Sequence, residues 1–299
     1  MTNGRRERPG PHSIWLRALV VSVVVMGSVV AGALTASGQI TYQRGQSIAP
    51  SFEGWMPNPD GTFEIYFGYM NRNFEEHLHI PVGPDNYLEP GGPDLGQPTA
   101  FLPRRNRDVF TVTVPADFGD KELVWTLKAN GKTASTYASL IPGFIFDQRI
   151  IYRQHTGFDV QGEVEHNQIP TVQIEGDTSV SATVGQPISI TAIASDDGVP
   201  APQQARGGAF QGSSLGLRVS WFVYRGNDAT VSFDPKQFKV FPDFRHGSPW
   251  TRGWRPPPLQ EDGRFPVQVT FNETGIFVLR VLAHDGGSAS SQDVLVTVR

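Results

Sequence analysis

Apolar and polar residues alternate with a period of two along most of this chain, in short runs separated by turn residues. One such run covers residues 275–285, where Phe277, Leu279, Val281 and Ala283 alternate with more polar neighbours. Successive side chains of a β-strand point to opposite faces, so this spacing predicts a strand with one buried face. Beyond the N-terminal segment, no stretch keeps a helical period for three turns. The pattern therefore predicts an all-β chain.

The first half of the chain is predicted to form an antiparallel β-sandwich over residues 40–145. The turn Asn58-Pro59-Asp60-Gly61 should connect a short strand at 52–55 with a strand at 63–69. Asn130-Gly131 lies between two alternating runs and predicts a hairpin, because both residues accept positive φ. The remaining strands are expected at residues 77–82, 109–114, 122–129, 133–140 and 144–152, with loops at 83–99 and 103–108.

The second half, residues 170–299, is predicted to form another sandwich, after a strand end and polar linker at 146–169. Eight short strands with turn residues between them are typical of a β-sandwich. Trp221 lies in the middle of one strand, where a core tryptophan belongs. The eight strands are expected at residues 171–174, 179–184, 188–195, 217–224, 230–233, 265–271, 276–284 and 294–298.

The second half resembles bacterial immunoglobulin-like modules of the polycystic-kidney-disease (PKD) and cadherin-like type. The resemblance rests on "VGQPISITAIASDDG", on "FNETGIF", and on a strand ending in Asp285-Gly286 before V-x-V-x-V. Phe277 stands where those modules carry a tyrosine, and the segments 199–216 and 241–263 are unusually long. The resemblance implies an immunoglobulin-like fold and no particular activity, because such sandwiches serve many functions.

The first half contains "GYMNRN", "IPVGPDN" and "FLPRRNRDVFTVTVP", which resemble segments of uncharacterised exported bacterial proteins. This second resemblance implies export and no activity.

Residues 1–38 read as a signal peptide or a signal anchor. Four arginines precede an uncharged, strongly apolar run, and small residues crowd its end. The apolar run is slightly short for a comfortable membrane span and long for a cleaved signal, so both alternatives stay open. Either one predicts an exported protein that is periplasmic, secreted or at the cell surface.

Composition narrows the possible functions. The chain has no cysteine, so disulfides, thiolate metal sites and cysteine nucleophiles are excluded, and packing alone must hold an exported fold together. The net charge of −4 falls to about −7 if the leader is removed, because the leader holds four arginines and one glutamate. A mildly acidic protein lacks the basic face that nucleic acid requires.

A loop rich in tryptophan and arginine is the strongest candidate for a binding site. Tryptophans four residues apart, interleaved with arginines, suit stacking on sugar rings or on a protein partner. The alternative is that the tryptophans fold back onto the sandwich under cation–π contacts from the arginines. The candidate residues are Arg245, Trp250, Arg252, Trp254 and Arg255.

Two other polar clusters lie in the first half. His77 and His79 would share one face of a strand and could bind zinc or copper if a third ligand completed the site. Arg104, Arg105 and Arg107 could clamp a carboxylate or phosphate, or pair with acids such as Asp108. Each cluster has a structural alternative, as an exposed strand face or as surface ion pairs, and no metal ligand is predicted.

Asp196, Asp197 and Asp285 end neighbouring strands in the immunoglobulin-like interpretation. Carboxylates gathered at one end of a sandwich can hold calcium together with backbone carbonyls, or they can simply form turns. No other cofactor is indicated.

The motifs H-E-x-x-H and G-x-x-x-x-G-K-[ST] are missing from the sequence. The single match to G-x-S-x-G, "GSSLG" at residues 212–216, is followed by a predicted strand and not by the helix that a nucleophilic serine of this motif requires. We therefore expect a non-enzymatic binding, adhesion or scaffold role towards protein or polysaccharide of the cell envelope. The alternative is an accessory protein or hydrolase with a site in the loops of the first sandwich, among Glu75, His77, Arg104 and Arg105.

Overall fold

The structure is a computed structural model that describes residues 42–145, 147, 150, 166–202, 216–237 and 257–299. These residues form β-strands, all paired antiparallel except β10 with β16, and two short 3₁₀ turns, Pro142–Phe144 (η1) and Asp228–Thr230 (η3), which confirms the all-β prediction. A search of the same residues finds no helix of the length and apolarity that a membrane crossing needs. The predicted leader at residues 1–38 lies outside them.

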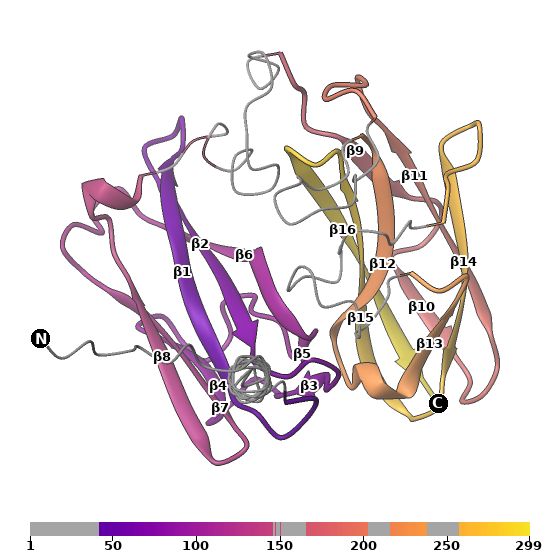
Figure 1. Cartoon of the computed structure of the whole chain (residues 1–299), viewed down its shortest axis with the longest axis horizontal. Helices are drawn as coiled ribbons and strands as arrows, with labels where there is room; N and C mark the ends of the chain where they lie inside the picture. Colours follow the sequence, from indigo (N-terminus) through magenta and orange to yellow (C-terminus); the bar gives the residue numbers. More distant parts are fainter. Residues whose placement is uncertain (1–41, 146, 148–149, 151–165, 203–215, 238–256) are drawn as a thin grey trace, which may run out of the picture. The chain divides into compact units, whose positions relative to one another are not determined.

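The first sandwich packs two three-stranded sheets against one another (Figure 1). One sheet has the order β1-β2-β6 and the other β4-β7-β8, with a two-stranded ribbon, β3-β5, beside them. Phe67, Phe110 and Trp125 lie between the sheets with ring centroids 4.9–5.9 Å apart. The strands are β1 Ile48–Pro57, β2 Phe63–Asn71, β3 Leu78–His79, β4 Asn86–Glu89, β5 Ala100–Phe101, β6 Arg104–Val114, β7 Leu123–Ala129 and β8 Lys132–Ala138.

Both turns predicted in this half are present. Gly61 donates its N–H to Asn58 O at 3.0 Å, which closes the turn between β1 and β2. Asn130 and Gly131 take φ values of 48° and 73°, which the two-residue hairpin between β7 and β8 requires.

Four expectations for the first half were wrong. The presumed loop 83–99 contains β4, and the presumed loop 103–108 is the start of β6. Only Leu78–His79 of the strand expected at 77–82 pairs, with β5. The strand expected at 144–152 does not begin at Phe144, which lies in turn η1, and Ile145 makes a single bridge to Trp55; apart from residues 147 and 150, the rest of that range lies outside the described residues. Pro142 is the first residue of turn η1, and its fixed φ favours the turn at this point.

The second sandwich contains all eight predicted strands (Figure 1). They form two four-stranded sheets, β10-β16-β15-β12 and β13-β14-β11-β9. In immunoglobulin notation these are the A′GFC and DEBA sheets, and β10 runs parallel to β16 as an A′ strand does. The strands are β9 Thr171–Ile174, β10 Ser179–Ala182, β11 Ile188–Ser195, β12 Arg218–Arg225, β13 Val231–Asp234, β14 Arg264–Phe271, β15 Gly275–His284 and β16 Ala289–Val298.

This strand order establishes an immunoglobulin-like fold and does not separate PKD or cadherin-like modules from other members of that fold. The core follows the predicted alternation: Trp221, Leu279, Val281 and Ala283 are each 0% exposed and Phe277 is 3% exposed. By contacts, Tyr42–Arg299 form one compact unit. The division into domains at 40–145 and 170–299 therefore stays a prediction.

Candidate functional site

The five residues predicted for the binding loop fall in the range 238–256, outside the described residues. Their role in binding therefore stays a prediction. The other sequence candidates can be placed: the histidines and arginines of the first half do not converge on one another, whereas the three aspartates of the second half lie together.

Arg105 forms a partly buried ion pair on the β1-β2-β6 sheet, on the face where Gly68 lies. Its Nη2 lies 2.5 and 2.6 Å from the two carboxylate oxygens of Glu53, whose side chain is only 4% exposed. Gly68 leaves the space for this pair, because a Cβ at that position would overlap Glu53 and come within 2.5 Å of Asn106 O. Burial raises the pKa of Glu53, and the charge and hydrogen bonds of Arg105 offset that rise only in part. The pair is thus a structural feature of the β1-β2-β6 sheet.

Arg104 is engaged elsewhere. Its guanidinium lies 3.7 Å from the centroid of the Phe74 ring, and Nη1 donates to Arg72 O at 3.2 Å. Arg104 has a φ of 68°, so the start of β6 is irregular and its side chains do not follow the simple strand alternation. Arg104 and Arg105 therefore contact different groups and do not form one anion clamp.

His77 and His79 also have separate surroundings. His77 Nδ1 pairs with Asp228 Oδ2 of the second sandwich. Burial lowers the pKa of His79, and the charge of Glu273 opposes that change. In the described ranges, no three side chains of His, Asp or Glu lie close enough together to share a metal ion.

Buried amides explain the polar motifs of the first half. In "GYMNRN", Asn71 Nδ2 donates to Glu76 O at 2.8 Å and to Phe101 O at 3.1 Å, and Asn73 Nδ2 donates to Asn71 Oδ1 at 2.9 Å. Both asparagines are 0% exposed. A buried amide with its hydrogen bonds satisfied fixes the loops around it, since any displacement would leave polar groups unpaired.

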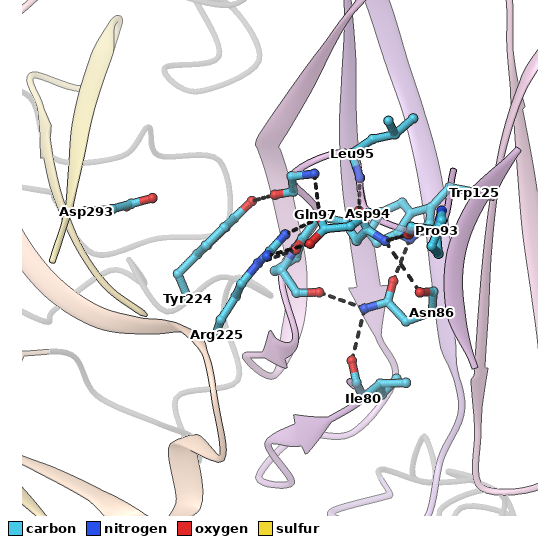
Figure 2. Close-up of polar contacts among 12 residues, drawn as sticks. Ile80, Asn86, Pro93, Asp94, Leu95, Gln97, Trp125, Tyr224, Arg225 and Asp293 are labelled. Atoms are coloured by element: carbon cyan, nitrogen blue, oxygen red, sulfur yellow. Dashed lines mark hydrogen bonds and ion pairs between the residues drawn. The ribbon is translucent and has the colours of Figure 1, made fainter. Parts of the chain in front are cut away.

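Asn86, from "IPVGPDN", organises the segment between β4 and β5 (Figure 2). Its Nδ2 donates to Ile80 O at 3.0 Å and to Pro98 O at 2.8 Å, and its Oδ1 accepts from Trp125 Nε1 at 3.0 Å. Gln97, also 0% exposed, donates to Pro93 O at 2.5 Å and accepts the Leu95 N–H. These amides fix residues 93–99 as an ordered loop, which we call the amide loop.

The end of β12 contacts the amide loop through two consecutive side chains (Figure 2). The strand register shifts between Val223 and Arg225, so a β-bulge is present at Tyr224. A bulge re-aims the next side chain, so both Tyr224 and Arg225 reach the first sandwich. Tyr224 Oη donates to Gly96 O at 2.6 Å, and Arg225 Nη1 and Nη2 donate to the Asp94 carboxylate at 3.0 and 2.7 Å.

Backbone groups complete this contact. Arg225 Nε donates to Gln97 O at 3.0 Å, Thr99 N–H to Tyr224 O at 3.1 Å, and Gly226 N–H to Thr99 Oγ1 at 2.9 Å. Gly226 has a φ of 116°, and a Cβ there would overlap the Phe277 ring, so only glycine fits. We call Tyr224, Arg225, Asp94, Gln97 and Thr99 the bulge contact.

Arg280 supports the bulge contact from β15. Its guanidinium lies 3.4 Å from the centroid of the Tyr224 ring and donates to Asp293 at 2.7 and 2.8 Å. Nη1 also donates to Val109 O of the first sandwich at 3.2 Å. The whole arrangement lacks a nucleophile held by a base, and its chemistry is that of a fixed contact between two β-sandwiches.

Sequence reasoning missed the bulge contact. One local signal was available: in "WFVYRGND" two polar residues, Tyr224 and Arg225, follow an apolar run without alternating. That signal suggests an irregular strand end and gives no partner, because Asp94 lies 131 residues from Arg225 in the chain.

Alkaline conditions should destabilise the fold through its buried tyrosines. Burial raises the pKa of Tyr66 and of Tyr224 from 10.0 to about 12, and raises that of Tyr69 further. Folding keeps these buried hydroxyl groups protonated, whereas the tyrosines of the unfolded chain ionise from about pH 10. The free energy of unfolding is therefore unaffected by them below pH 10 and falls as pH rises towards 12. The nearly fully buried Tyr224 then contributes a limiting slope of about −1.4 kcal/mol per pH unit in the free energy of unfolding, and the more exposed Tyr66 contributes less.

We predict that Tyr224→Phe removes one such contribution. Urea unfolding between pH 9 and pH 11 should show a shallower pH dependence for this variant than for the parent. Tyr137→Phe is the matched control, since Tyr137 is 62% exposed. Equal slopes for Tyr224→Phe and the parent would contradict the burial of the Tyr224 hydroxyl.

The three aspartates proposed from sequence do lie at one end of the second sandwich. Asp196 Oδ2 accepts the Gly198 N–H at 3.0 Å, and Asp285 Oδ1 accepts the N–H groups of Gly287 and Ser288 at 2.6 and 2.7 Å. Burial raises the pKa of Asp196, and the charges of Asp285 and Asp197 add to that rise. The turn interpretation is thus correct for Asp196 Oδ2, for Asp285 Oδ1 and for both oxygens of Asp197, which accept the N–H groups of Gln168 and Val199. Among the described residues, Asp196 Oδ1 and Asp285 Oδ2 are buried without a hydrogen-bond partner.

Comparisons with known proteins give no family. No protein-family model matches the chain, and no curated protein does. Among solved structures, the chain is similar to domains 4 and 5 of the S-layer protein SbsC at 12% identity and a TM-score of 0.24, and it spans 65% of that chain and 60% of its own length. It is also similar to fibronectin(III)-like modules of Clostridium thermocellum CbhA, at 11% identity and a TM-score of 0.22 over 85% of this chain and 94% of that one.

A chimeric titin Z1Z2 tandem is similar over 84% of this chain and 99% of its own, at 12% identity and a TM-score of 0.24. At such identities and TM-scores these likenesses do not indicate a function. The assignment of the fold stands on the strand order of the two sheets.

Proposed function

We propose that this chain is an exported, non-enzymatic protein that binds or scaffolds components of the cell envelope. The supporting observation is that the candidate catalytic groups already have separate structural partners. Arg105 pairs with Glu53, Arg104 stacks on Phe74, and His77 pairs with Asp228. Side chains committed to three separate structural partners are not available as one acid–base or anion site. The hydrolase alternative, which needed these groups to converge in one place, loses its support.

The binding surface that we propose is the loop holding Arg245, Trp250, Arg252, Trp254 and Arg255. Support comes from its composition, since tryptophan and arginine are the residues enriched where interfaces gain most of their energy. The partner would be a polysaccharide or a protein of the envelope, with the tryptophans stacking and the arginines pairing with anionic groups. We also propose, on the sequence motifs alone, that the second sandwich is of the PKD or cadherin-like type.

The test is to replace Trp250 and Trp254 by Ala and to measure retention on glycan arrays and on immobilised envelope extracts. The proposal expects retention to fall by about tenfold or more, which is the effect of losing roughly 1.4 kcal/mol of contact energy. Tyr137→Ala is the control, because it removes an aromatic ring that is 62% exposed elsewhere on the chain. Retention equal to that of the parent would exclude this loop.

A second proposal concerns calcium at the end of the second sandwich. Within the part of the chain that the structure describes, three buried oxygens there have no hydrogen-bond partner: Asn167 Oδ1, Asp196 Oδ1 and Asp285 Oδ2. Ser288 connects two of these residues, since its N–H donates to Asp285 Oδ1 and its Oγ accepts from Asn167 Nδ2 at 3.0 Å. Hard oxygens of carboxylate and amide groups are what calcium prefers, and backbone carbonyls and water would complete the shell.

We predict that calcium raises the melting temperature of the protein by a few degrees relative to the same sample in chelator. Asp285→Asn should abolish the increase, because it removes one charge while keeping an acceptor for Gly287 and Ser288. Asp262→Asn is the control, as Asp262 caps a turn in the same sandwich through the Arg264 N–H. No shift with calcium, or a shift that survives in Asp285→Asn, would reject the site.

A further inference from the structure

We infer that the two sandwiches unfold as one cooperative unit, coupled through the contact of the Tyr224–Arg225 bulge with the amide loop. Tandem β-sandwiches joined by a polar linker move and unfold separately unless a substantial interface joins them. The sequence suggested such a linker at residues 146–169. The contacts between the described residues favour the opposite behaviour, and this inference goes beyond the proposed binding role.

The hydrophobic cores of the two sandwiches meet at the bulge contact. Ala100 of β5 is 4% exposed and belongs to the core cluster of the second sandwich. In return, Tyr224 is 3% exposed and belongs to the core cluster of the first, where Phe222 and Val278 also pack. Removing the second sandwich would therefore expose apolar surface of the first, and the reverse also holds, so each stabilises the other.

The polar groups around this apolar junction are satisfied across it. Tyr224 Oη, Gly226 N–H and Thr99 N–H all find their partners in the other sandwich. Unfolding of one sandwich would leave these groups without partners in the other. An interface of this kind transmits instability in either direction, whereas an exposed ion pair such as Arg225–Asp94 alone contributes little.

Two further contacts make the junction wider than a single point. Arg280 donates to Val109 O at 3.2 Å, and His77 pairs with Asp228, whose side chain is 7% exposed. Asp228 lies in η3, directly after the bulge, so the described contacts come from both β15 and the β12–β13 connection.

The coupling can be tested by destabilising one sandwich and observing the other. Leu123→Ala removes a side chain that is 2% exposed in β7, a strand that pairs with β4 and β8 of the first sandwich. Pulsed hydrogen–deuterium exchange of the full chain at increasing urea concentration reports β7 and β15 separately by mass spectrometry. If the sandwiches are coupled, the urea midpoint of β15 falls with that of β7, by the same amount.

A second variant removes the coupling itself. Tyr224→Ala with Arg225→Ala, combined with Leu123→Ala, should separate the two midpoints so that β15 unfolds after β7. Arg264→Ala in the same background is the matched control, because it breaks the Arg264–Glu175 ion pair within the second sandwich. Should the triple variant fail to fold, Tyr224→Phe with Arg225→Gln replaces it and is expected to give a smaller separation.

Two results would overturn the inference. One is a β15 midpoint that stays at the parent value in Leu123→Ala, which would show independent unfolding. The other is a pair of midpoints that stay equal in the bulge variants, which would place the coupling elsewhere. Neither result depends on whether the protein binds a polysaccharide, so this test and the test of the proposed function fail separately.

Discussion

Replacing Asn86 by Leu is expected to lower the free energy of unfolding by about 3–9 kcal/mol, since it leaves three buried groups unpaired at about 1–3 kcal/mol each. The leucine side chain has the same branching and the same number of heavy atoms as that of asparagine, but it contains no hydrogen-bonding atom. Ile80 O, Pro98 O and Trp125 Nε1 would each lose the partner that Asn86 now provides at 2.8–3.0 Å. Asn86 and Trp125 are both 0% exposed, so water cannot replace these hydrogen bonds without opening the core.

Urea unfolding of the full chain measures this loss. Asn58→Ala is the control, because its side chain bonds only Thr62 Oγ1 in a turn, at 2.9 Å, and its removal should cost less than about 1 kcal/mol. The Asn86→Leu variant should also lose exchange protection in the amide loop first, since Asn86 holds Pro98. A loss below about 1 kcal/mol would mean that Asn86 does not organise this region.

Arg105→Met is expected to cost about 3–5 kcal/mol, because it leaves the Glu53 carboxylate buried without its partner. Glu53 would respond by holding a proton, and its folded-state pKa would rise above the present one. A carboxyl group whose pKa is raised by folding stabilises the folded state at low pH. This stabilisation is complete below the pKa of the unfolded state, near 4.5, and is lost as pH rises through the pKa of the folded state. The difference in free energy of unfolding between parent and variant should therefore be smaller in mild acid than at neutral pH.

Two further variants distinguish this explanation from a general loss of packing. Glu53→Gln combined with Arg105→Met should recover much of the lost stability, since no unpaired charge remains. Arg264→Met should change stability by less than about 1 kcal/mol, because the Arg264–Glu175 pair is exposed on both sides, at 43% and 37%. If Arg105→Met and Arg264→Met behave alike, the Glu53–Arg105 pair does not have the burial described here.

The second sandwich was predictable strand by strand because its pattern is local. Each strand buries one face, so Phe277, Leu279 and Val281 alternate with half-buried or exposed residues, and the period is visible without knowledge of the partner strand. Turn residues at Asp196–Gly198 and Asp285–Gly287 mark the strand ends. The first sandwich was less predictable, because β4 has only four residues and β6 begins with the polar, non-alternating Arg104–Asp108.

The candidate site was not predictable in the same way. A bulge at Tyr224 reverses the expected direction of Arg225, and the sequence alone does not show whether a strand end is bulged. Glu53 and Arg105 are 52 residues apart and read separately as ordinary surface charges. The polar motifs of the first half attracted functional hypotheses, whereas their asparagines are buried and hold loops in place. Polar residues in unusual local patterns indicated long-range structure here more than chemistry.

The central claim is that this protein binds envelope material without transforming it. The most direct measurement incubates the full chain with purified envelope polysaccharide and protein fractions, and follows retention of the chain and release of soluble fragments in the same samples. The proposed function predicts retention that the Trp250→Ala, Trp254→Ala variant loses, with the bound polymer recovered intact. Release of fragments in proportion to the amount of protein, or no retention on any fraction, would contradict it.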